Sequence, residues 1–145
     1  MGVFSAMNVA ATGMTAQQLR MDTIAENIAN ASTTRTENGE AYRRKMVVFT
    51  EKDTTSFDNI LNGYMTYYQP NGVKVNNIVE DQSDLRLVYE PDNPDANEEG
   101  YVEYPNVDTV TEMTNLIGSS RSYEAAVTSF NASKSMAMKG LELFG

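Results

Sequence analysis

Apolar and small residues recur at seven-residue intervals near both ends of this 145-residue chain. In the first thirty residues, one such row runs through Met7, Met14, Met21 and Ile28. A similar stripe occupies residues 113–141. Alternating steps of three and four residues are typical of helices in a coiled coil or bundle. The residues predicted to pack against other helices are Phe4, Met7, Ala11, Met14, Met21, Ile24, Ile28, Met113, Leu116, Tyr123, Val127, Phe130 and Leu141.

The two predicted helices are poorly suited to forming a core by themselves. Gln17 and Gln18 fall inside the N-terminal stripe, and small residues occupy several sides of the C-terminal helix. The chain also has nine methionines, whose flexible side chains adapt to irregular contacts. These features favour packing among many neighbouring helices, although two core helices of an ordinary globular domain stay an alternative. Pro105 breaks the chain before the second helix, with Asn106 or Asp108 as its N-cap.

The middle of the chain has the pattern of β structure. Strands are predicted at residues 44–49, 64–68, 73–79 and 84–90, with a tight turn at Asn71-Gly72. The predicted fold is therefore α+β, with N- and C-terminal helices pairing in a coiled-coil-like bundle and a small β-rich middle domain. The predicted divisions are an N-terminal helix over 1–31, a turn or linker over 32–41, a β-rich domain over 42–104 and a C-terminal helix over 105–145.

The linker after the first helix has its own signals. Asn27 and Asn30 stand where that helix is predicted to end, because asparagine tolerates the left-handed backbone conformation found there. Residues 32–34 are Ser-Thr-Thr, whose hydroxyls bond their own backbone and disfavour further helix. Glu37-Asn38-Gly39 then predicts a turn.

Composition excludes several classes of protein. The chain has no cysteine and no histidine, which removes disulfides, thiolate chemistry, the usual general base and the commonest metal ligand. Residues 51–105 hold twelve acidic and three basic side chains, an imbalance that disfavours nucleic-acid binding. No run of eighteen apolar residues predicts a membrane-spanning helix. A cleaved secretory signal is not expected either, since no basic segment precedes an apolar one.

The remaining candidates for a chemical site are weak. Asp95–Gly100 resembles the first half of a calcium-binding loop, but Asn106 stands where the last ligand should be glutamate. A solvated acidic loop explains that segment better. Ser135 and Lys139 share a helical side, as in a serine–lysine dyad, yet nothing nearby predicts an oxyanion-binding nest. We therefore expect no enzyme activity, no cofactor or metal, and no small-molecule substrate.

Three longer stretches carry a resemblance to a known family. They are NIANASTTRTENGEAYRRKMVVF (27–49), PDNPDANEEGYVEYPNVDTVTEM (91–113) and SSRSYEAAVTSFNASKSMAMKGLEL (119–143). Together they resemble the bacterial flagellar rod and hook axial proteins, and within them the proteins of the proximal rod. That family has an Asn-Leu-Ala-Asn motif in its first helix, where Ile28 replaces leucine here. The residues matching the family pattern are Asn27, Ala29, Asn30, Tyr42, Arg43, Pro105, Asn106, Val107, Arg121 and Tyr123.

The resemblance implies a structural subunit of the proximal rod of the flagellar basal body. Such a subunit polymerises with copies of itself and other rod proteins to transmit motor torque, its helices forming a tube with the β-rich part outside. It would leave the cytoplasm through the flagellar type III export apparatus without a cleaved signal, and lie in the rod within the cell envelope. The alternative is a coiled-coil adaptor or secreted protein of a type III export system. An adaptor needs one such helix, whereas both ends carry the stripe here.

Overall fold

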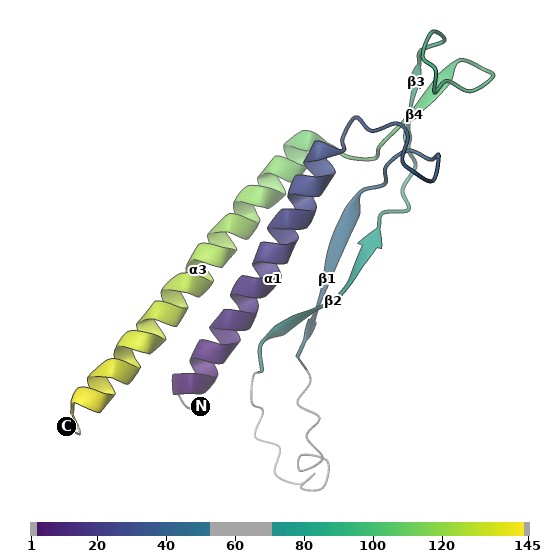
Figure 1. Ribbon diagram of the computed structural model, residues 1–145. Helices are drawn as coiled ribbons and strands as arrows, with labels where there is room; N and C mark the ends of the chain where they lie inside the picture. The colour runs from purple at the N-terminus through teal and green to yellow at the C-terminus, as the bar shows by residue number, and fades with distance from the viewer. Residues whose placement is uncertain (1–2, 53–70, 144–145) are drawn as a thin grey trace, which may run out of the picture.

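The computed structural model describes residues 3–52 and 71–143. Its elements are α1 (Val3–Ala29), β1 (Lys45–Glu51), β2 (Val73–Glu80), β3 (Arg86–Tyr89), β4 (Tyr101–Tyr104) and α3 (Thr109–Glu142). The two helices lie side by side along an elongated molecule (Figure 1). Both ends of the described chain lie at one end of the molecule, and the β3–β4 hairpin lies at the other. The predicted α+β fold with paired terminal helices is confirmed.

Helix α3 begins where an aspartate can cap it. Asp108 has an extended backbone, and its side chain accepts a hydrogen bond from the Val110 amide at 3.2 Å. Glu112 lies in the first turn and Lys139 in the last, which places each charge at the end of the helix dipole that favours it. Of the two predicted N-caps, Asp108 is therefore the correct one.

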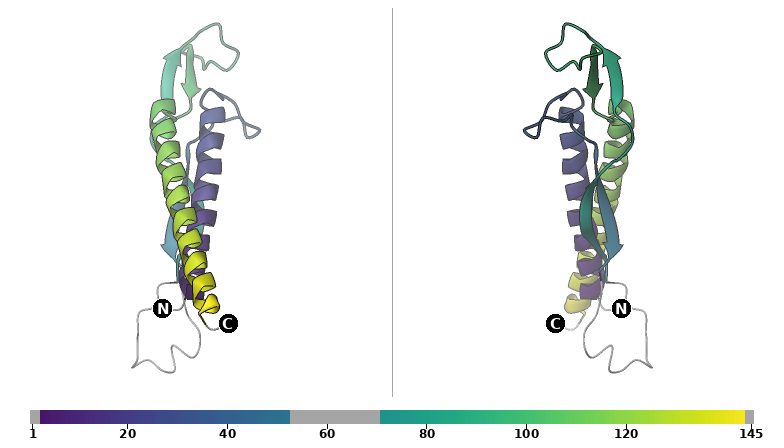
Figure 2. Two further views of the ribbon diagram at one scale, coloured as in Figure 1. Left: turned by 90° about the vertical axis from the view of Figure 1, so that its left-hand side faces the viewer. Right: turned by 90° about the vertical axis from the view of Figure 1, so that its right-hand side faces the viewer.

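Helix α1 is the middle layer of the lower part of the molecule. Helix α3 covers one side of it, and the β1–β2 ribbon lies along another (Figure 2). Thr12 Oγ1 accepts a hydrogen bond from the Val73 amide at 3.2 Å, and the Arg20 guanidinium lies 5.8 Å from the centre of the Phe49 ring. Gly72 has φ of +91°, and a Cβ there would lie 2.1 Å from Thr12 Oγ1. This close approach requires glycine.

The strands form two separate antiparallel pairs in the described residues. β1 pairs with β2 from Lys45↔Glu80 to Glu51↔Val73, with an irregularity between Val48 and Phe49. The predicted strands at 44–49 and 73–79 are confirmed, whereas the one at 64–68 lies outside the described residues. The predicted division of the chain into domains stays a prediction.

The β3–β4 hairpin projects beyond the helices. β3 confirms the strand predicted at 84–90 in a shorter form. β4 was not predicted, because its pattern is confined to four residues, whereas the alternation around β3 extends over residues 84–90. In this pair, Val88 lies opposite Val102, which is completely buried. Asp95, in the connecting loop, accepts a hydrogen bond from Thr34 and forms an ion pair with Arg35. These contacts tie the loop to the linker after α1.

The end of α1 differs from the prediction. Asn27 lies within the helix, which ends at Ala29, and no non-glycine residue in the described part of the chain has a positive φ. The left-handed conformation predicted for Asn27 and Asn30 is therefore wrong. Asn30 instead uses its side-chain amide to donate to the Glu26 carbonyl at 2.9 Å. The predicted turn is confirmed at Gly39, with φ of +83° and a bond from its amide to the Thr36 carbonyl.

Candidate assembly interface

Small residues on α3 line its contact with α1. Glu112, Ser119 and Ser133 are buried and fall in one row of seven-residue spacing, which also includes Ala126. A Cβ built on Gly13 of α1 would lie 3.9 Å from the Ala126 Cβ. Small side chains let two helices approach closely, as the sequence predicts. The contact buries few large apolar groups, so it contributes only modest hydrophobic stabilisation.

A second side of α3 carries large apolar residues that the described part of the chain leaves exposed. Val110, Met113 and Ile117 follow three- and four-residue steps, and their side chains are 71%, 55% and 56% exposed. Together these three residues are the exposed stripe. Large apolar side chains gathered on one helix side are typical of a surface that binds another protein. Helix α3 therefore has two different surfaces: one packs against α1, and the other, the exposed stripe, is free to bind a neighbouring molecule.

The predicted packing residues divide between these two environments. Ile24 is buried, and nine others are half-buried: Met7, Ala11, Met14, Met21, Ile28, Leu116, Tyr123, Val127 and Phe130. Three are exposed, namely Phe4, Met113 and Leu141. The structure thus buries most of them wholly or in part and leaves three exposed. Their part in assembly stays a prediction.

Asn27 is the centre of a buried polar cluster formed with Tyr42, Arg44, Lys45 and Glu112. Its Oδ1 accepts from the Lys45 amide at 2.8 Å and from the Tyr42 hydroxyl at 2.9 Å. Its Nδ2 donates to the Lys45 carbonyl at 2.8 Å and to Glu112 Oε2 at 3.0 Å. The fully buried amide therefore makes four hydrogen bonds, which satisfies it completely. One side chain thereby joins α1, β1 and α3.

Glu112 is the buried charge of this polar cluster, with only 1% of its side chain exposed. Its Oε1 accepts from Arg44 Nε at 2.9 Å and Nη2 at 2.8 Å. Burial by itself would lower the pKa of Arg44, but its hydrogen bonds and ion pairs with Glu112, then Asp81, raise that pKa. A buried carboxylate needs such a partner, because leaving it unpaired is strongly destabilising.

The same carboxylate affects Tyr42. Burial of the phenol, followed by the negative charges of Glu26, Glu112 and Glu80, raises the pKa of Tyr42 to about 12. The hydroxyl is therefore neutral at physiological pH and donates to Asn27. This donation fixes which atom of the Asn27 side chain is the oxygen.

Asn106 extends the network towards the β3–β4 hairpin. Its Oδ1 accepts from the Arg44 amide at 2.9 Å, and its Nδ2 donates to the Asp81 carbonyl at 3.0 Å and to Ser83 Oγ at 2.9 Å. Asp81 also accepts from the Ser83 amide, and this bond, followed by others from the Ser83 and Arg44 side chains, lowers the pKa of Asp81. The segments leading into β3 and α3 are thereby fixed to the start of β1.

The residues of the family pattern are not all part of this network. Asn27, Tyr42 and Asn106 belong to it directly, Pro105 is buried beside Asn106, and Arg43 donates to the Ser83 carbonyl. The others lie on or just after a helix or, for Val107, between β4 and α3. Asn30, Val107 and Tyr123 are half-buried, and Ala29 and Arg121 are exposed. The sequence pattern did not indicate Arg44, Lys45 or Glu112. The one available signal was a glutamate in a row of otherwise small residues.

Comparison with known proteins gives two family-model matches. A model described as "Flagella basal body rod protein" matches residues 7–35, and one described as "Flagellar basal body rod FlgEFG protein C-terminal" matches residues 98–143. The chain is 52% identical to the flagellar basal-body rod protein FlgC of Bacillus subtilis, over 99% of both chains. The chain belongs to the FlgC family.

More distant members of the FlgC family match over the same length. FlgC of Borreliella burgdorferi is 44% identical, over 99% of this chain and 98% of that one. FlgC of Escherichia coli O6:H1 is 41% identical with the same coverage. Members of this family are structural subunits of the flagellar basal-body rod, so the predicted function as a structural rod subunit is confirmed. No helix within residues 3–52 and 71–143 is long and apolar enough to cross a membrane.

Proposed function

We propose that this rod subunit assembles in the proximal rod through the exposed side of its helix pair, and that the resulting polymer transmits motor torque. The observation that carries the proposal is the exposed stripe of Val110, Met113 and Ile117. These residues lie on a helix whose opposite side already packs against α1. Covering them requires another subunit, either a copy of this chain or another rod protein.

The polar cluster supports the mechanical part of the proposal. Torque applied at the helices passes to the β ribbon through the connections between α1, α3 and β1. The hydrogen bonds of Asn27 and the ion pair of Glu112 with Arg44 resist relative sliding of these elements, because sliding breaks several of them at once. A network of buried polar contacts is more directional than apolar packing, since hydrogen bonds weaken steeply away from linear geometry.

The proposed route to the rod is export through the flagellar type III apparatus without removal of a signal peptide. The relatives are named as basal-body rod proteins, which supports a final position in the basal body. The thin intramolecular core suits this route, because a chain with little buried apolar area unfolds readily for passage through a narrow channel.

Electron microscopy of purified basal bodies tests the proposal. Cells lacking the gene should build no complete rods, and the wild-type chain should restore both rods and motility. Ile117→Asp should fail to restore them, because it places a carboxylate in the proposed contact. Ser129→Asp is the matched control, since Ser129 is an exposed polar residue on another side of α3. Complete rods with Ile117→Asp would contradict the proposed contact, and complete rods without the gene would contradict the proposed function.

A further inference from the structure

The β3–β4 hairpin presents an uncovered aromatic and aliphatic surface. Its register places Leu87 opposite Glu103 and Tyr89 opposite Tyr101 on one side of the two strands. Leu87 is 60% exposed and Tyr89 is 64% exposed, and the two tyrosine rings pack edge to face with centroids 5.3 Å apart. These four residues are the hairpin surface. The other side of the same strands carries Val88 and the fully buried Val102.

The opposite end of the molecule carries a surface of matching character. Lys134, Met138 and Leu141 follow steps of four and three residues on α3, so they lie on one side of the helix, and all three are exposed. Leu141 is 73% exposed. These three residues are the helix-end surface. It offers a cation followed by two apolar side chains.

The two surfaces are complementary in charge. Residues 84–104 carry seven acidic side chains and one basic side chain. The basic one, Arg86, lies 5.3 Å from the centre of the Tyr104 ring, on the other side of the hairpin. Glu103 is therefore the one charged residue among the four of the hairpin surface, and none of the four is a cation. Lys134 is the corresponding charged member of the helix-end surface.

The spacing of the groups also agrees. Tyr101 and Glu103 are two residues apart on β4, which separates them by about 6.8 Å. Lys134 and Met138 are one helical turn apart, which separates them by about 6 Å along the axis. If Lys134 lies against Glu103, Met138 therefore lies against the ring pair of Tyr89 and Tyr101. Methionine sulfur packs favourably against aromatic rings at this kind of contact.

The two surfaces cannot meet within one molecule. Helix α3 has 34 residues, so it extends about 50 Å. The hairpin lies beyond its N-terminal end, and the helix-end surface lies near its C-terminal end (Figures 1 and 2). A contact between two different surfaces is heterologous, and it joins successive copies into an open polymer when the rotation between them does not close a ring.

We propose that the hairpin surface of one subunit binds the helix-end surface of a second copy of this chain, with Glu103 against Lys134 and the tyrosine pair against Met138 and Leu141. This contact rests on the proposed assembly of the chain into a rod, and it specifies an axial contact distinct from the exposed stripe. Asp95 supports it by holding the hairpin loop to the linker through Thr34 and Arg35.

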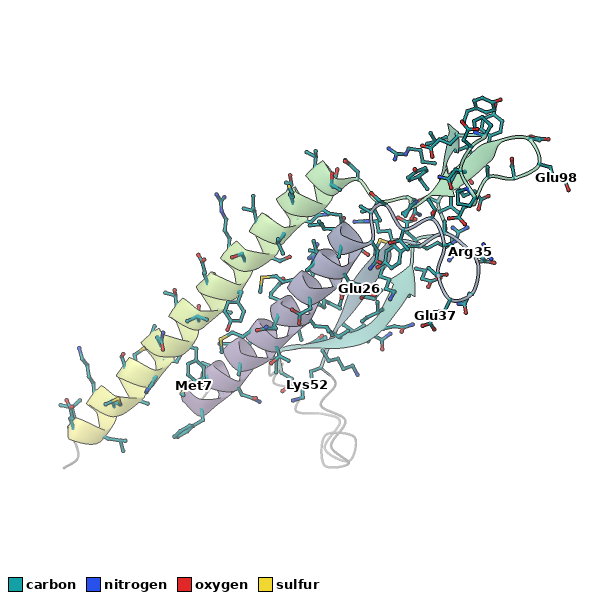
Figure 3. The ribbon with its side chains drawn as sticks, turned by 45° about the horizontal axis from the view of Figure 1, so that its top comes forward. Met7, Glu26, Arg35, Glu37, Lys52 and Glu98 are labelled. Atoms are coloured by element: carbon teal, nitrogen blue, oxygen red, sulfur yellow. The ribbon has the colours of Figure 1, made fainter. Side chains whose placement is uncertain are left out.

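Charge reversal in the full-length chain tests the contact. Glu103→Lys and Lys134→Glu are each introduced into cells lacking the gene, and complete rods are counted by electron microscopy. Each variant opposes two like charges, so we expect at least about a tenfold drop in complete rods. The chain carrying both substitutions restores the attraction and should return the count towards the wild-type level. Glu98→Lys is the control, because Glu98 lies at the far end of the hairpin loop (Figure 3).

Each result has one meaning. Rescue by the double variant supports the contact and shows that both single variants fold. Normal rods with either single variant, or failure of the double variant, would overturn it. If the wild-type chain itself restored no rods, the proposed function would fail instead.

A cross-linking measurement gives an independent readout. The chain has no cysteine, so Tyr89→Cys and Leu141→Cys can be placed in two separate copies without background. Co-expression should give a disulfide-linked dimer in purified rods under mild oxidation, whereas Tyr89→Cys with Thr15→Cys, an exposed site on α1, should give none. Absence of the dimer linked through positions 89 and 141 from intact rods would overturn the contact.

Discussion

Asn27 and Glu112 lie 85 residues apart in the chain and share a 3.0 Å hydrogen bond in the interior of the protein. Asn27 is completely buried, and only 1% of Glu112 is exposed. The bond joins the last turns of α1 to the first turn of α3, and the other bonds of Asn27 hold the start of β1. A motif that sequence reasoning assigned to the end of a helix is thus the point at which three elements are joined.

Replacing Asn27 with alanine should destabilise the protein by about 2–4 kcal/mol, because each buried group left without a partner costs about 1–3 kcal/mol. The Lys45 amide and carbonyl and the Tyr42 hydroxyl would all lose their partner. Urea unfolding followed by circular dichroism measures this. Asn30→Ala is the control, since its side chain bonds only within the end of α1 and the linker, and it should cost less than about 1 kcal/mol. Equal effects of the two would refute the central role of Asn27.

Two glutamates allow buried and exposed ion pairs to be compared. Glu112→Gln removes the negative charge that pairs with Arg44 in the interior. We expect the free energy of unfolding to fall by about 2–3 kcal/mol. This is less than the loss usual for a broken buried ion pair, because Arg44 is partly exposed. Glu26→Gln removes the partner of Lys45 at the surface, where such pairs contribute about 0–1 kcal/mol. The difference should persist in high salt, because a buried pair is poorly screened. A larger effect at Glu26 would contradict the assignment.

Two glycines with positive φ separate backbone strain from steric contact. Gly39 has φ of +83° with no atom within 4 Å of a built Cβ, whereas Gly72 has φ of +91° and Thr12 Oγ1 at 2.1 Å. Gly39→Ala should cost about 1–2 kcal/mol, which is the strain of the left-handed conformation. Gly72→Ala should cost more, because the β ribbon must move away from α1. Thermal melts measure both, and equal costs would show that Gly72 does not contact α1 closely in solution.

The raised pKa of Tyr42 predicts a change of stability in alkali. The folded protein holds the phenol proton up to a pKa of about 12, compared with 10.0 for the ordinary group. The corresponding stability is complete below pH 10 and is lost as the pH rises towards 12. Wild-type protein should therefore lose stability more steeply over this interval than Tyr42→Phe. Denaturation at several pH values tests this, and since the two proteins differ only at position 42, the comparison isolates the contribution of this phenol. Identical slopes would contradict the burial of Tyr42.

The helices and most strands could be predicted because the apolar residues in them recur with the period of a helix or of a strand. The seven-residue rows that include Met14 and Phe130 arise from the geometry of the helix itself, so they are visible without any tertiary information. β4 was missed because its pattern is confined to four residues, whereas the alternation around the equally short β3 extends over residues 84–90. The turn at Gly39 was predicted correctly, because only a residue without a side chain adopts its φ easily.

The polar cluster could not be predicted, because its partners come from distant parts of the chain. Asn27 is a poor helix former judged locally, and only its bonds to β1 and Glu112 explain why it sits inside α1. Glu112 was equally obscure, since a glutamate in the first turn of a helix is ordinarily an exposed residue that interacts with the dipole. Local preference places Asn27 at a helix end and Glu112 at an exposed helix start, whereas tertiary hydrogen bonding places both in the interior.

The most direct test of the account is a cryo-electron microscopy map of the intact basal-body rod in which this chain is traced. We predict that Val110, Met113 and Ile117 lie against a helix of a neighbouring subunit, within van der Waals contact, while the Asn27–Glu112 bond is kept in every copy. A rod in which this stripe faces solvent in the traced copies would contradict the account.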